Sequence, residues 1–256
     1  MSLTIDLKGK TALITGATGQ LGRVMVHTFA QCGANVVIHF MNNSKHAEVL
    51  LNQIRSMGVE GCVVQGDVGE PDDVWRMKSE IEQKMALPDI AVTNAVSQIF
   101  PWQSVLDEEV EDYDNQFKSC VMQNVLIAKA FVPNMIQKGW GRFVGINTEV
   151  SIQTLETQSA YAAGKKGMDG VLRVLAREVG PNGITVNQVA PGWTITHRNR
   201  DKMIEAQQAY ASGVPLRRRG EAQEVANVVA FLSSDLASFI TGAFVPVNGG
   251  NTFVGI

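Results

Sequence analysis

The sequence predicts an α/β protein built around a doubly wound, parallel sheet of about seven strands, with helices on both faces. Short runs rich in β-branched residues alternate with longer segments of helical periodicity along all 256 residues. No stretch rich in Pro, Gly or Ser divides the chain, so we expect one domain over residues 1–256. Alternation of strands and helices favours right-handed βαβ units, which place helices on both sides of a parallel sheet.

The expected strands are apolar almost throughout, which is typical of strands that are covered on both faces. The first, residues 11–15, reads Thr-Ala-Leu-Ile-Thr and ends directly before a turn with three glycines. Six similar runs follow at residues 35–40, 61–65, 90–94, 142–147, 185–189 and 243–247. Each run has the length of a strand.

The segments between these runs carry apolar residues at helical spacing. They span residues 21–32, 44–57, 71–85, 109–138, 159–179 and 221–233. Pro71 suits the first turn of a helix, while Gly33, Gly58 and Gly139 suit helix ends. Residues 191–215 have weak periodicity and many polar side chains, so we expect either a mobile lid with a short helix or a plain surface loop there.

The composition excludes several classes of function. The net charge is −3, from 22 basic and 25 acidic residues, so there is no general attraction to nucleic acids or anionic membranes. No apolar run reaches the roughly 18 residues of a membrane span, and the first residues lack the features of a secretion signal. The three cysteines are widely spaced, which suits a reduced cytoplasmic protein and offers neither a disulfide framework nor a metal site.

A glycine-containing turn joins the first strand to the first helix, where residues 15–22 read Thr-Gly-Ala-Thr-Gly-Gln-Leu-Gly. Glycines let the backbone approach a pyrophosphate, while free N–H groups and the positive end of the helix dipole face the anion. The residues that can take part are Gly16, Thr18, Gly19, Gln20, Leu21 and Gly22. A Walker loop is excluded because no Gly-Lys-Ser/Thr sequence follows. A tight turn without a ligand is the alternative, but its place in the first βαβ unit favours a dinucleotide and hence a Rossmann-type domain.

The end of the second strand indicates which dinucleotide is bound. An acidic residue about twenty positions after the glycines would bind the ribose hydroxyls of NAD(H). Here residues 39–45 read His-Phe-Met-Asn-Asn-Ser-Lys, and no carboxylate occurs in this segment before Glu48. Asn42, Asn43, Ser44 and Lys45 can instead donate to a ribose phosphate, so NADP(H) is favoured and NAD(H) stays possible. The alternative is that these are only loop and helix-cap residues.

Tyr161 and Lys165 place a phenol and an ammonium group four residues apart, hence on one face of the helix expected at residues 159–179. Alone, such a pair is more often a solvated surface contact. This helix, however, is rich in small residues and follows a strand that ends Gly-Ile-Asn-Thr at residues 145–148. The end of that strand should open onto the cofactor crevice, which would place the hydroxyl of Thr148 beside the phenol.

Together these motifs resemble the short-chain dehydrogenase/reductase family, and the similarity extends from Lys8 to Gly250. It rests on residues 15–22, Asp67-Val68, Thr93-Asn94-Ala95, Tyr161 with Lys165, Pro191-Gly192 and Val247-Asn248-Gly249-Gly250. Within the family, the chain looks most like the β-ketoacyl reductases. The resemblance implies an NAD(P)-dependent oxidoreductase that interconverts a carbonyl and an alcohol. It also implies a homotetramer that forms through the two long helices and the last strand.

The resemblance implies a role for each matching residue. Tyr161 would be the general acid in carbonyl reduction, Lys165 would bind the nicotinamide ribose and make the phenol more acidic, and Thr148 would donate to the substrate oxygen. The residues near the cofactor would be Asp67 and Val68 at the adenine, Asn94, Ala95 and Val96 around the adjacent ribose, and Pro191, Gly192, Thr194 and Thr196 at the nicotinamide. These roles suit the chemistry, since hydride transfer builds negative charge that needs a proton donor and pre-placed hydrogen bonds.

Several positions depart from the family pattern. Gln20 and Val96 replace glycines, and Thr148 carries a methyl group that the usual serine lacks. Cys120 occupies the slot of an active-site asparagine whose backbone carbonyl, in the family, holds a water of the proton relay. Because a backbone carbonyl survives substitution, we expect slower or altered activity rather than none. Asn124, one turn later, either compensates in part or is a surface amide, and the Cys120 side chain is expected to behave as a small apolar group.

The expected substrate is a small ketone or alcohol with hydrophobic bulk. Its pocket would be walled mainly by apolar residues, namely Gln98, Phe100, Pro101, Trp102, Val150, Leu155 and Trp193. A free small molecule is at least as good a candidate as an acyl carrier protein, since Pro133 and Asn182 occupy sites where carrier-protein reductases can carry arginine. Two other functions stay open: a nucleotide-binding sensor or scaffold that has lost efficient catalysis, and an epimerase or dehydratase with a tightly held cofactor.

Overall fold

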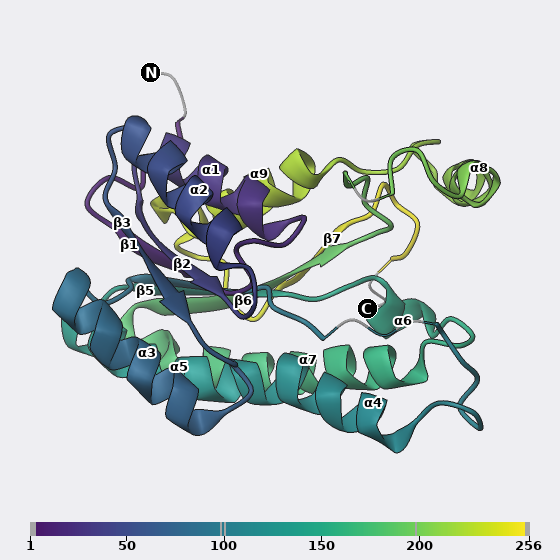
Figure 1. Ribbon diagram of the computed structural model, residues 1–256, viewed down its shortest axis with the longest axis horizontal. Coiled ribbons are helices and arrows are strands. Elements are labelled where there is room, and N and C mark those ends of the chain that lie inside the picture. Colours follow the sequence, from purple (N-terminus) through teal and green to yellow (C-terminus); the bar gives the residue numbers. More distant parts are fainter. Residues whose placement is uncertain (1–3, 98, 100, 198, 254–256) are drawn as a thin grey trace.

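One sheet of seven parallel strands forms the centre of the computed structural model, which describes residues 4–97, 99, 101–197 and 199–253 (Figure 1). The order of the strands is β3-β2-β1-β4-β5-β6-β7. Their bounds are β1 (Thr11–Ile14), β2 (Asn35–Phe40), β3 (Gly61–Gln65), β4 (Ile90–Thr93), β5 (Gly141–Ile146), β6 (Ile184–Pro191) and β7 (Phe244–Val247). All seven predicted strands are confirmed, with ends that differ by at most two residues.

Helices cover both faces of the sheet, as predicted (Figure 1). One face carries α1 (Gly22–Gln31), α2 (Ser44–Ser56) and α9 (Ala222–Leu232), and the other carries α3 (Pro71–Lys84), α5 (Gln123–Lys138) and α7 (Ser159–Val179). Pro71 begins α3, and Gly139 ends α5 in the left-handed conformation, with φ of 64°. Within the described ranges, no helix combines the length and apolar character that crossing a membrane requires.

Each face of the sheet buries its own hydrophobic cluster. Ile14 of β1 packs with Phe29 of α1 on one face, and Leu13 packs with Met77 of α3 and Phe131 of α5 on the other. Neighbouring residues of β1 point to opposite clusters because side chains alternate across a strand. Burial on both faces explains why the strands read as continuous apolar runs.

The helical stretch predicted over residues 109–138 is present from Val110 to Lys138, but it is not one α-helix, because its middle part has π-helical winding. α4 (Val110–Gln116) continues into η1 (Phe117–Met122) before α5 begins. This segment packs on α7, where a Cβ at Gly164 would lie 2.9 Å from the Gln116 carbonyl oxygen and one at Gly167 would lie 2.8 Å from Val121 Cγ2. Gly164 and Gly167 therefore leave room for a contact within the chain, whereas Gly170 faces open space.

Short helices occupy the loops at one end of the sheet. The segment after β6 contains α8 (Ile204–Gly213), and α6 (Val150–Gln153) follows β5. Two 3₁₀ turns, η2 (Gly180–Asn182) and η3 (Asp235–Ala237), complete the elements. α8 buries none of its residues and stands apart from the two helix layers, at the same end of the molecule as α6 (Figure 1).

Candidate active site

A cleft of about 740 Å³ lies where the order of the sheet reverses, between β1 and β4. Residues that follow β1, β2, β3 and β4 line it, together with side chains of α7. Ligands of doubly wound sheets bind at such a switch point, outside the carboxyl ends of the strands. The sheet topology therefore places the glycine turn and the Tyr161 helix around one cavity.

The glycine turn is fixed by backbone contacts. Gly16 has φ of 60°, and a Cβ there would lie 2.9 Å from Ala95 Cα. A Cβ at Gly22 would lie 2.3 Å from the Gly16 carbonyl oxygen, so neither position accommodates a side chain. The backbone N–H groups of Thr18 and Gln20 have no acceptor among the residues that the structure describes. With the N-terminus of α1, these free donors suit a pyrophosphate.

His39, at the end of β2, connects the glycine turn to the end of β3. Its Nδ1 accepts a hydrogen bond from the Gly16 N–H (3.0 Å), and its Nε2 lies 2.9 Å from the Gly66 carbonyl oxygen. Because Nδ1 is the acceptor, the ring is neutral and carries its proton on Nε2. Burial lowers the pKa of His39 from 6.5 to about 4, although Gly66, Asp67 and Asp73 act in the opposite direction. No motif in the sequence marks this residue.

Asn94 and Ala95, after β4, are hydrogen-bonded to the end of β1. Asn94 Nδ2 donates to the carbonyl oxygens of Thr15 (2.9 Å) and Gly16 (3.2 Å). Thr15 Oγ1 accepts from the backbone N–H groups of Asn94 (2.8 Å) and Ala95 (3.0 Å) and donates to Gln123 Oε1 (2.5 Å). Gln123 Nε2 donates back to the Ala95 carbonyl oxygen (2.8 Å). The ends of β1 and β4 and the start of α5 are thus cross-linked beside the cleft.

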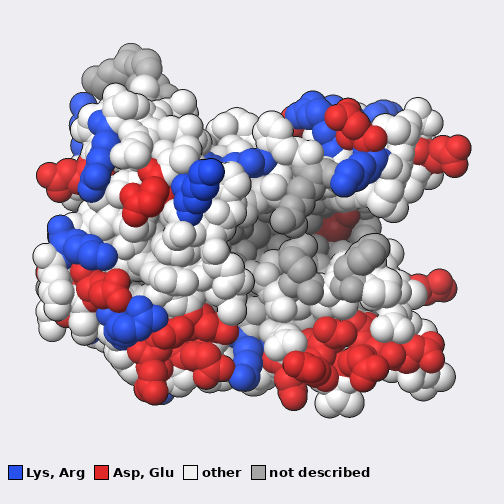
Figure 2. Space-filling view, in the orientation of Figure 1, with Lys and Arg blue, Asp and Glu red and all other residues white. Residues whose placement is uncertain are grey.

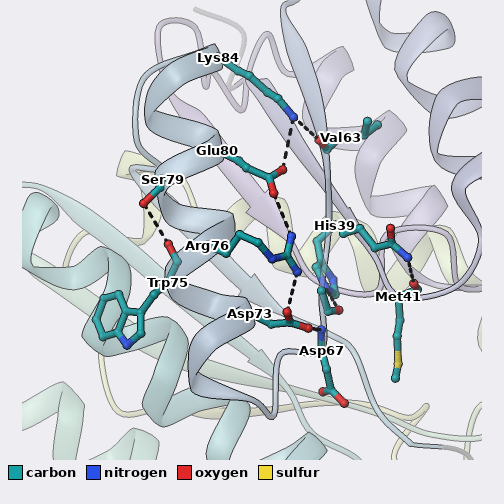
Figure 3. A network of polar contacts seen from close by, with 12 residues as sticks. His39, Met41, Val63, Asp67, Asp73, Trp75, Arg76, Ser79, Glu80 and Lys84 are labelled. Atoms are coloured by element: carbon teal, nitrogen blue, oxygen red, sulfur yellow. Dashed lines mark hydrogen bonds and ion pairs between the residues drawn. The ribbon is translucent and has the colours of Figure 1, made fainter.

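The loop of Asp67, after β3, is held from the side of α3 (Figure 3). Its backbone N–H donates to Asp73 Oδ2 (2.7 Å), and its own Oδ1 accepts from the Gly69 N–H (2.8 Å). Arg76 binds Asp73 at 2.6 Å and Glu80 at 2.9 Å, which extends the polar network along α3. The hydrogen bond from the Asp67 backbone and the Arg76 guanidinium lower the pKa of Asp73. The carboxylate of Asp73 is therefore available as an acceptor at neutral pH.

Residues 42–45 form the loop before α2 and the first turn of that helix. Asn43 is the N-cap, since its Oδ1 accepts from the His46 N–H at 3.2 Å. The helix-cap interpretation is therefore correct for Asn43, which together with Asn42 also lines the cleft. The N-terminus of α2 adds partial positive charge to this part of the wall.

Tyr161 and Lys165 both line the cleft from α7. Lys165 Nζ lies 5.9 Å from the centre of the Tyr161 ring and donates to the Ile146 carbonyl oxygen (2.6 Å). Only 3% of the Lys165 surface is exposed. Trp102 packs against Tyr161 with ring centres 5.9 Å apart. An ammonium group is thus held near a phenol in a largely dry environment.

Thr148 lies just beyond β5, next to Asn147, whose Nδ2 donates to the Lys165 carbonyl oxygen (3.1 Å). The Thr148 hydroxyl accepts from the Val150 N–H at 3.3 Å, at the start of α6. The residue is buried and stands outside the cleft wall formed by the described residues. That its hydroxyl lies beside the phenol stays a prediction.

Cys120 lies in the π-helical segment and is fully buried. Its Sγ is 3.6 Å from Gln116 Oε1, and its carbonyl oxygen accepts from Asn124 Nδ2 at 2.6 Å. Asn124 Oδ1 accepts from Thr93 Oγ1 at 2.6 Å, and Asn124 is fully buried, so the expectation of a surface amide is wrong. The carbonyl that the family resemblance assigns to a relay water has a protein donor here.

The segment after β6 is held by Arg219. Its Nε and Nη2 donate to the carbonyl oxygens of Trp193 (3.0 Å) and Thr194 (2.7 Å), and its guanidinium lies 4.4 Å from the centre of the Trp193 ring. Burial lowers the pKa of Arg219. Of the four residues expected near the nicotinamide, only Thr196 is part of the cleft wall.

The cleft brings together most of the predicted site residues. These are Gly16, Thr18, Gly19, Gln20, Leu21, Asn42, Asn43, Asp67, Val68, Asn94, Ala95, Val96, Tyr161, Lys165 and Thr196. Within the described ranges, the wall leaves out Gly22, Ser44, Cys120, Thr148, Pro191, Gly192 and Thr194. Gln98 and Phe100, expected in the substrate pocket, lie outside the described residues. The wall also includes residues without any motif, among them His39, Gly66, Asn115, Lys118, Ser119 and Asn199.

Charge is unevenly distributed around this side of the molecule. Figure 2 shows a hollow with acidic side chains gathered along its lower edge and basic side chains above it. The lower edge coincides with α4, which carries Glu111, Asp112 and Asp114. This contrast in charge gives the two edges different preferences for charged ligands.

Known sequences match nearly the whole chain. A family model described as enoyl-(acyl carrier protein) reductase matches residues 16–252. The 3-oxoacyl-[acyl-carrier-protein] reductase FabG of Pseudomonas aeruginosa is 36% identical over 247 residues, which cover 96% of this chain and 98% of that protein. Nodulation protein G of Azospirillum brasilense is 30% identical over 241 residues, covering 94% of this chain and 97% of that protein.

Solved structures share the architecture. LugOII, a promiscuous reductase that catalyses keto-reduction at C1 during lugdunomycin biosynthesis, superposes with a TM-score of 0.88 at 29% identity, covering 96% of this chain and 99% of that one. A gluconate 5-dehydrogenase from Burkholderia cenocepacia J2315, in complex with NADP and tartrate, gives a TM-score of 0.90 at 27% identity and covers 98% of each chain.

Proposed function

The chain belongs to the short-chain dehydrogenase/reductase family, an NAD(P)-dependent oxidoreductase family, and we propose that it transfers a hydride between NADP(H) and a carbonyl/alcohol pair. Tyr161 is the general acid/base of the proposed reaction. The observation that carries the proposal is the pairing of Tyr161 with Lys165 on the wall of the same cleft that the glycine turn borders.

The residues of the cleft fit a nicotinamide dinucleotide. The turn excludes side chains at Gly16 and Gly22 and leaves the N–H groups of Thr18 and Gln20 without a protein acceptor in the described part of the chain. The turn would hold the pyrophosphate, the Asp67 loop the adenine, and α7 the nicotinamide ribose. When bound, the cofactor supplies or accepts the hydride.

The protein supplies the proton and the electrostatic stabilisation. In the reducing direction, the Tyr161 hydroxyl donates its proton to the substrate oxygen as negative charge builds there. Lys165, held by the Ile146 carbonyl, attracts the phenolate that remains. Thr148 donates a hydrogen bond to the same substrate oxygen and orients it. In the oxidising direction, the phenolate accepts the proton of the alcohol.

Three observations support NADP(H) as the preferred cofactor, with NAD(H) as the alternative. The loop after β2 has no carboxylate before Glu48, the side chains of Asn42 and Asn43 line the cleft, and the N-terminus of α2 points its partial charge there. The gluconate 5-dehydrogenase with the same architecture was solved with NADP.

The proposed substrate is a free small ketone or alcohol with hydrophobic bulk, in a protein that forms a homotetramer. Pro133 and Asn182 are exposed and uncharged, which does not favour an acidic carrier protein as substrate, although FabG relatives are named for such a carrier. An open groove between α5 and α7, lined by Val125, Val171 and Val174, supports association through these helices. A monomer mass in light scattering would exclude the tetramer.

The test of the proposed function is the Tyr161→Phe variant in the full chain. We expect it to bind NADPH within about 3-fold of the wild type, because the ring stays in place, and to lose at least about 1,000-fold in turnover of a β-keto ester, because the proton donor is gone. The measurements are fluorescence titration with NADPH and NADPH oxidation at 340 nm. Normal turnover in the variant would exclude Tyr161 as the general acid.

The second candidate is a nucleotide-binding sensor or scaffold with impaired catalysis. It is favoured by the Asn124 amide, which donates to the Cys120 carbonyl oxygen at 2.6 Å and so uses one of its two lone pairs. This alternative predicts NADPH binding by the wild type without turnover of any member of a carbonyl and alcohol panel. An epimerase or dehydratase would instead copurify with its cofactor and show no net redox change.

A further inference from the structure

A buried carboxylate directly follows Thr148. Glu149 is 3% exposed, and no Lys or Arg of the described residues pairs with it. Its Oε1 accepts from the Tyr210 hydroxyl at 2.6 Å, and both of its oxygens lie 3.2 Å from Asn251 Nδ2. A buried carboxylate that loses its donors is costly, so these two contacts hold the segments that supply them.

Tyr210 connects three segments through one hydroxyl group. It lies on α8, donates to Glu149 and accepts from the backbone N–H of Trp193 at 2.9 Å. Its ring meets the Trp193 ring edge-on, with centres 5.6 Å apart and planes at 83°. Burial and the neighbouring Glu149 carboxylate raise the pKa of Tyr210, so the hydroxyl remains a donor at neutral pH. α8 is thus bonded to the loops after both β5 and β6.

Two glycines provide the space in which the α8 region is seated. A Cβ at Gly192 would lie 2.5 Å from the Tyr210 hydroxyl oxygen, and one at Gly249 would lie 2.7 Å from Val214 Cγ1. Val214, directly after α8, is fully buried, and the next turn is fixed by the Leu216 N–H donating to the Gly249 carbonyl (3.2 Å). Tyr210 and Val214 therefore pack closely against Gly192 and Gly249, where a side chain would clash.

α8 has little else to hold it. None of its ten residues is buried, and it stands apart from the helix layers that cover the sheet (Figure 1). A helix that buries no apolar face gains little from packing. In the first half of α8, Gln207 Nε2 donates to the carbonyl oxygens of Asn199 and Arg200 in the preceding loop. Its contacts with the rest of the molecule lie in the second half, where Tyr210 donates to Glu149 and Val214 is buried.

We propose that Glu149 and Tyr210, together with Asn251, form a latch that holds α8 closed beside the substrate, with Glu149 and Tyr210 as positioning residues for the reaction. The effect of the latch on substrate binding rests on the proposed function, whereas the contacts that hold α8 do not. Glu149 adjoins Thr148, and its backbone N–H donates to the Pro191 carbonyl at 3.1 Å. When α8 is closed, its contact with Glu149 fixes the loop that carries the Thr148 hydroxyl. When α8 opens, the bond from Tyr210 to Glu149 breaks, and Glu149 remains buried.

The latch is tested by hydrogen exchange of α8 peptides in the full chain, measured by mass spectrometry for Tyr210→Phe and Glu149→Gln. We expect α8 amides to exchange about 10-fold faster in Tyr210→Phe, because a hydrogen bond to a charged group is lost, while α7 is unchanged. The effect of the double variant should not exceed that of the larger single variant by more than about 2-fold, because both remove one contact. Tyr113→Phe, whose hydroxyl contacts Ser159, and Glu156→Gln, an exposed carboxylate, are matched controls that leave α8 unchanged.

Steady-state kinetics distinguish an effect on substrate positioning from an effect on the stability of α8 alone. With ethyl acetoacetate and NADPH, Tyr210→Phe should raise KM about 10-fold and change kcat and the NADPH affinity less than about 3-fold. Unchanged α8 exchange in both single variants, or effects that multiply in the double variant, would overturn the latch. Faster exchange with an unchanged KM would overturn the positioning role. If the wild type reduces no substrate, the proposed function fails, and the exchange measurement alone still decides the latch.

Discussion

The glycine turn after β1 and the α8 segment after β6 both follow strand ends on the cleft side of the sheet, but they differ in how closely they are packed. Backbone contacts fix the turn, where a Cβ at Gly22 would meet the Gly16 carbonyl oxygen at 2.3 Å. Side chains hold α8, which buries no residue and is bonded through Tyr210 and Glu149. Segments with few buried contacts open more readily than closely packed ones. We therefore expect the glycine turn to be rigid and α8 to be more mobile.

The largest expected effect comes from adding one methyl group to the glycine turn. Gly22→Ala brings its Cβ against the backbone of Gly16 and Ala17, which cannot move without opening the turn. We expect about 3 kcal/mol less free energy of unfolding and at least 10-fold weaker NADPH binding. Urea denaturation and fluorescence titration measure the two quantities. A loss below about 0.5 kcal/mol would show that the turn is as adaptable as α8.

The second effect is a pH dependence through His39, whose ring is bonded to the glycine turn. Since burial lowers its pKa from 6.5 to about 4, the unfolded chain binds a proton in this window and the folded chain does not. The contribution of His39 to the free energy of unfolding should therefore fall by about 3 kcal/mol as the pH drops from 7 to 4, and this part of the pH dependence should vanish in His39→Asn. Urea denaturation at several pH values tests this, with His27→Asn as the control. Equal pH slopes in wild type and His39→Asn would contradict it.

The third effect concerns the ribose phosphate at the α2 end of the cleft. Asn42→Asp adds a negative charge to an exposed residue of the wall, so NADPH should bind about 10-fold more weakly while NADH is nearly unaffected. The difference should shrink at high salt, because exposed charges are screened. Titration with both cofactors measures it, and the exposed Asn182→Asp is the control. Equal weakening of both cofactors would place the phosphate elsewhere.

The smallest expected effect comes from adding a methyl group to α8, as the counterpart of Gly22→Ala in the glycine turn. Gly213 ends α8, and a Cβ there would meet no atom within 4 Å. Gly213→Ala should stabilise the chain by about 0.5 kcal/mol through helix propensity and leave NADPH binding unchanged. Thermal unfolding checks this, and destabilisation comparable to that of Gly22→Ala would remove the contrast between the two segments.

The sequence predicts the sheet well because two-sided burial leaves a strong local signal, as in the apolar run that became β1. The glycine turn and the Tyr161–Lys165 spacing are local too, so both were predictable and both line the cleft. His39 was not, because an isolated histidine acquires its role only when Gly16 and Gly66 fold against it. Glu149 and Tyr210 are 61 residues apart and meet only through the folded chain.

The π-helical segment between α4 and α5 also makes contacts with residues that are distant in the sequence. Nothing in residues 117–122 departs from helical periodicity strongly enough to predict a π turn. The π-helical turn lies where Gly167 of α7 leaves room for Val121 of η1, and Gly164 leaves room for Gln116 at the end of α4. Element type was therefore predictable from the sequence, whereas the local winding was determined by packing.

The π turn also constrains any redesign of this protein. A π-helical stretch takes up about one residue more than an α-helix for the same rotation, and each residue of an α-helix accounts for about 100°. Winding all six residues of Phe117–Met122 as α-helix would therefore turn α4 around its axis relative to α5, and Lys118 and Asn115 would turn away from the cavity they now face. The irregular winding is thus a phase correction between two amphipathic stretches, and we expect that deleting one residue there restores α-helical winding while α4 keeps its face toward the cavity.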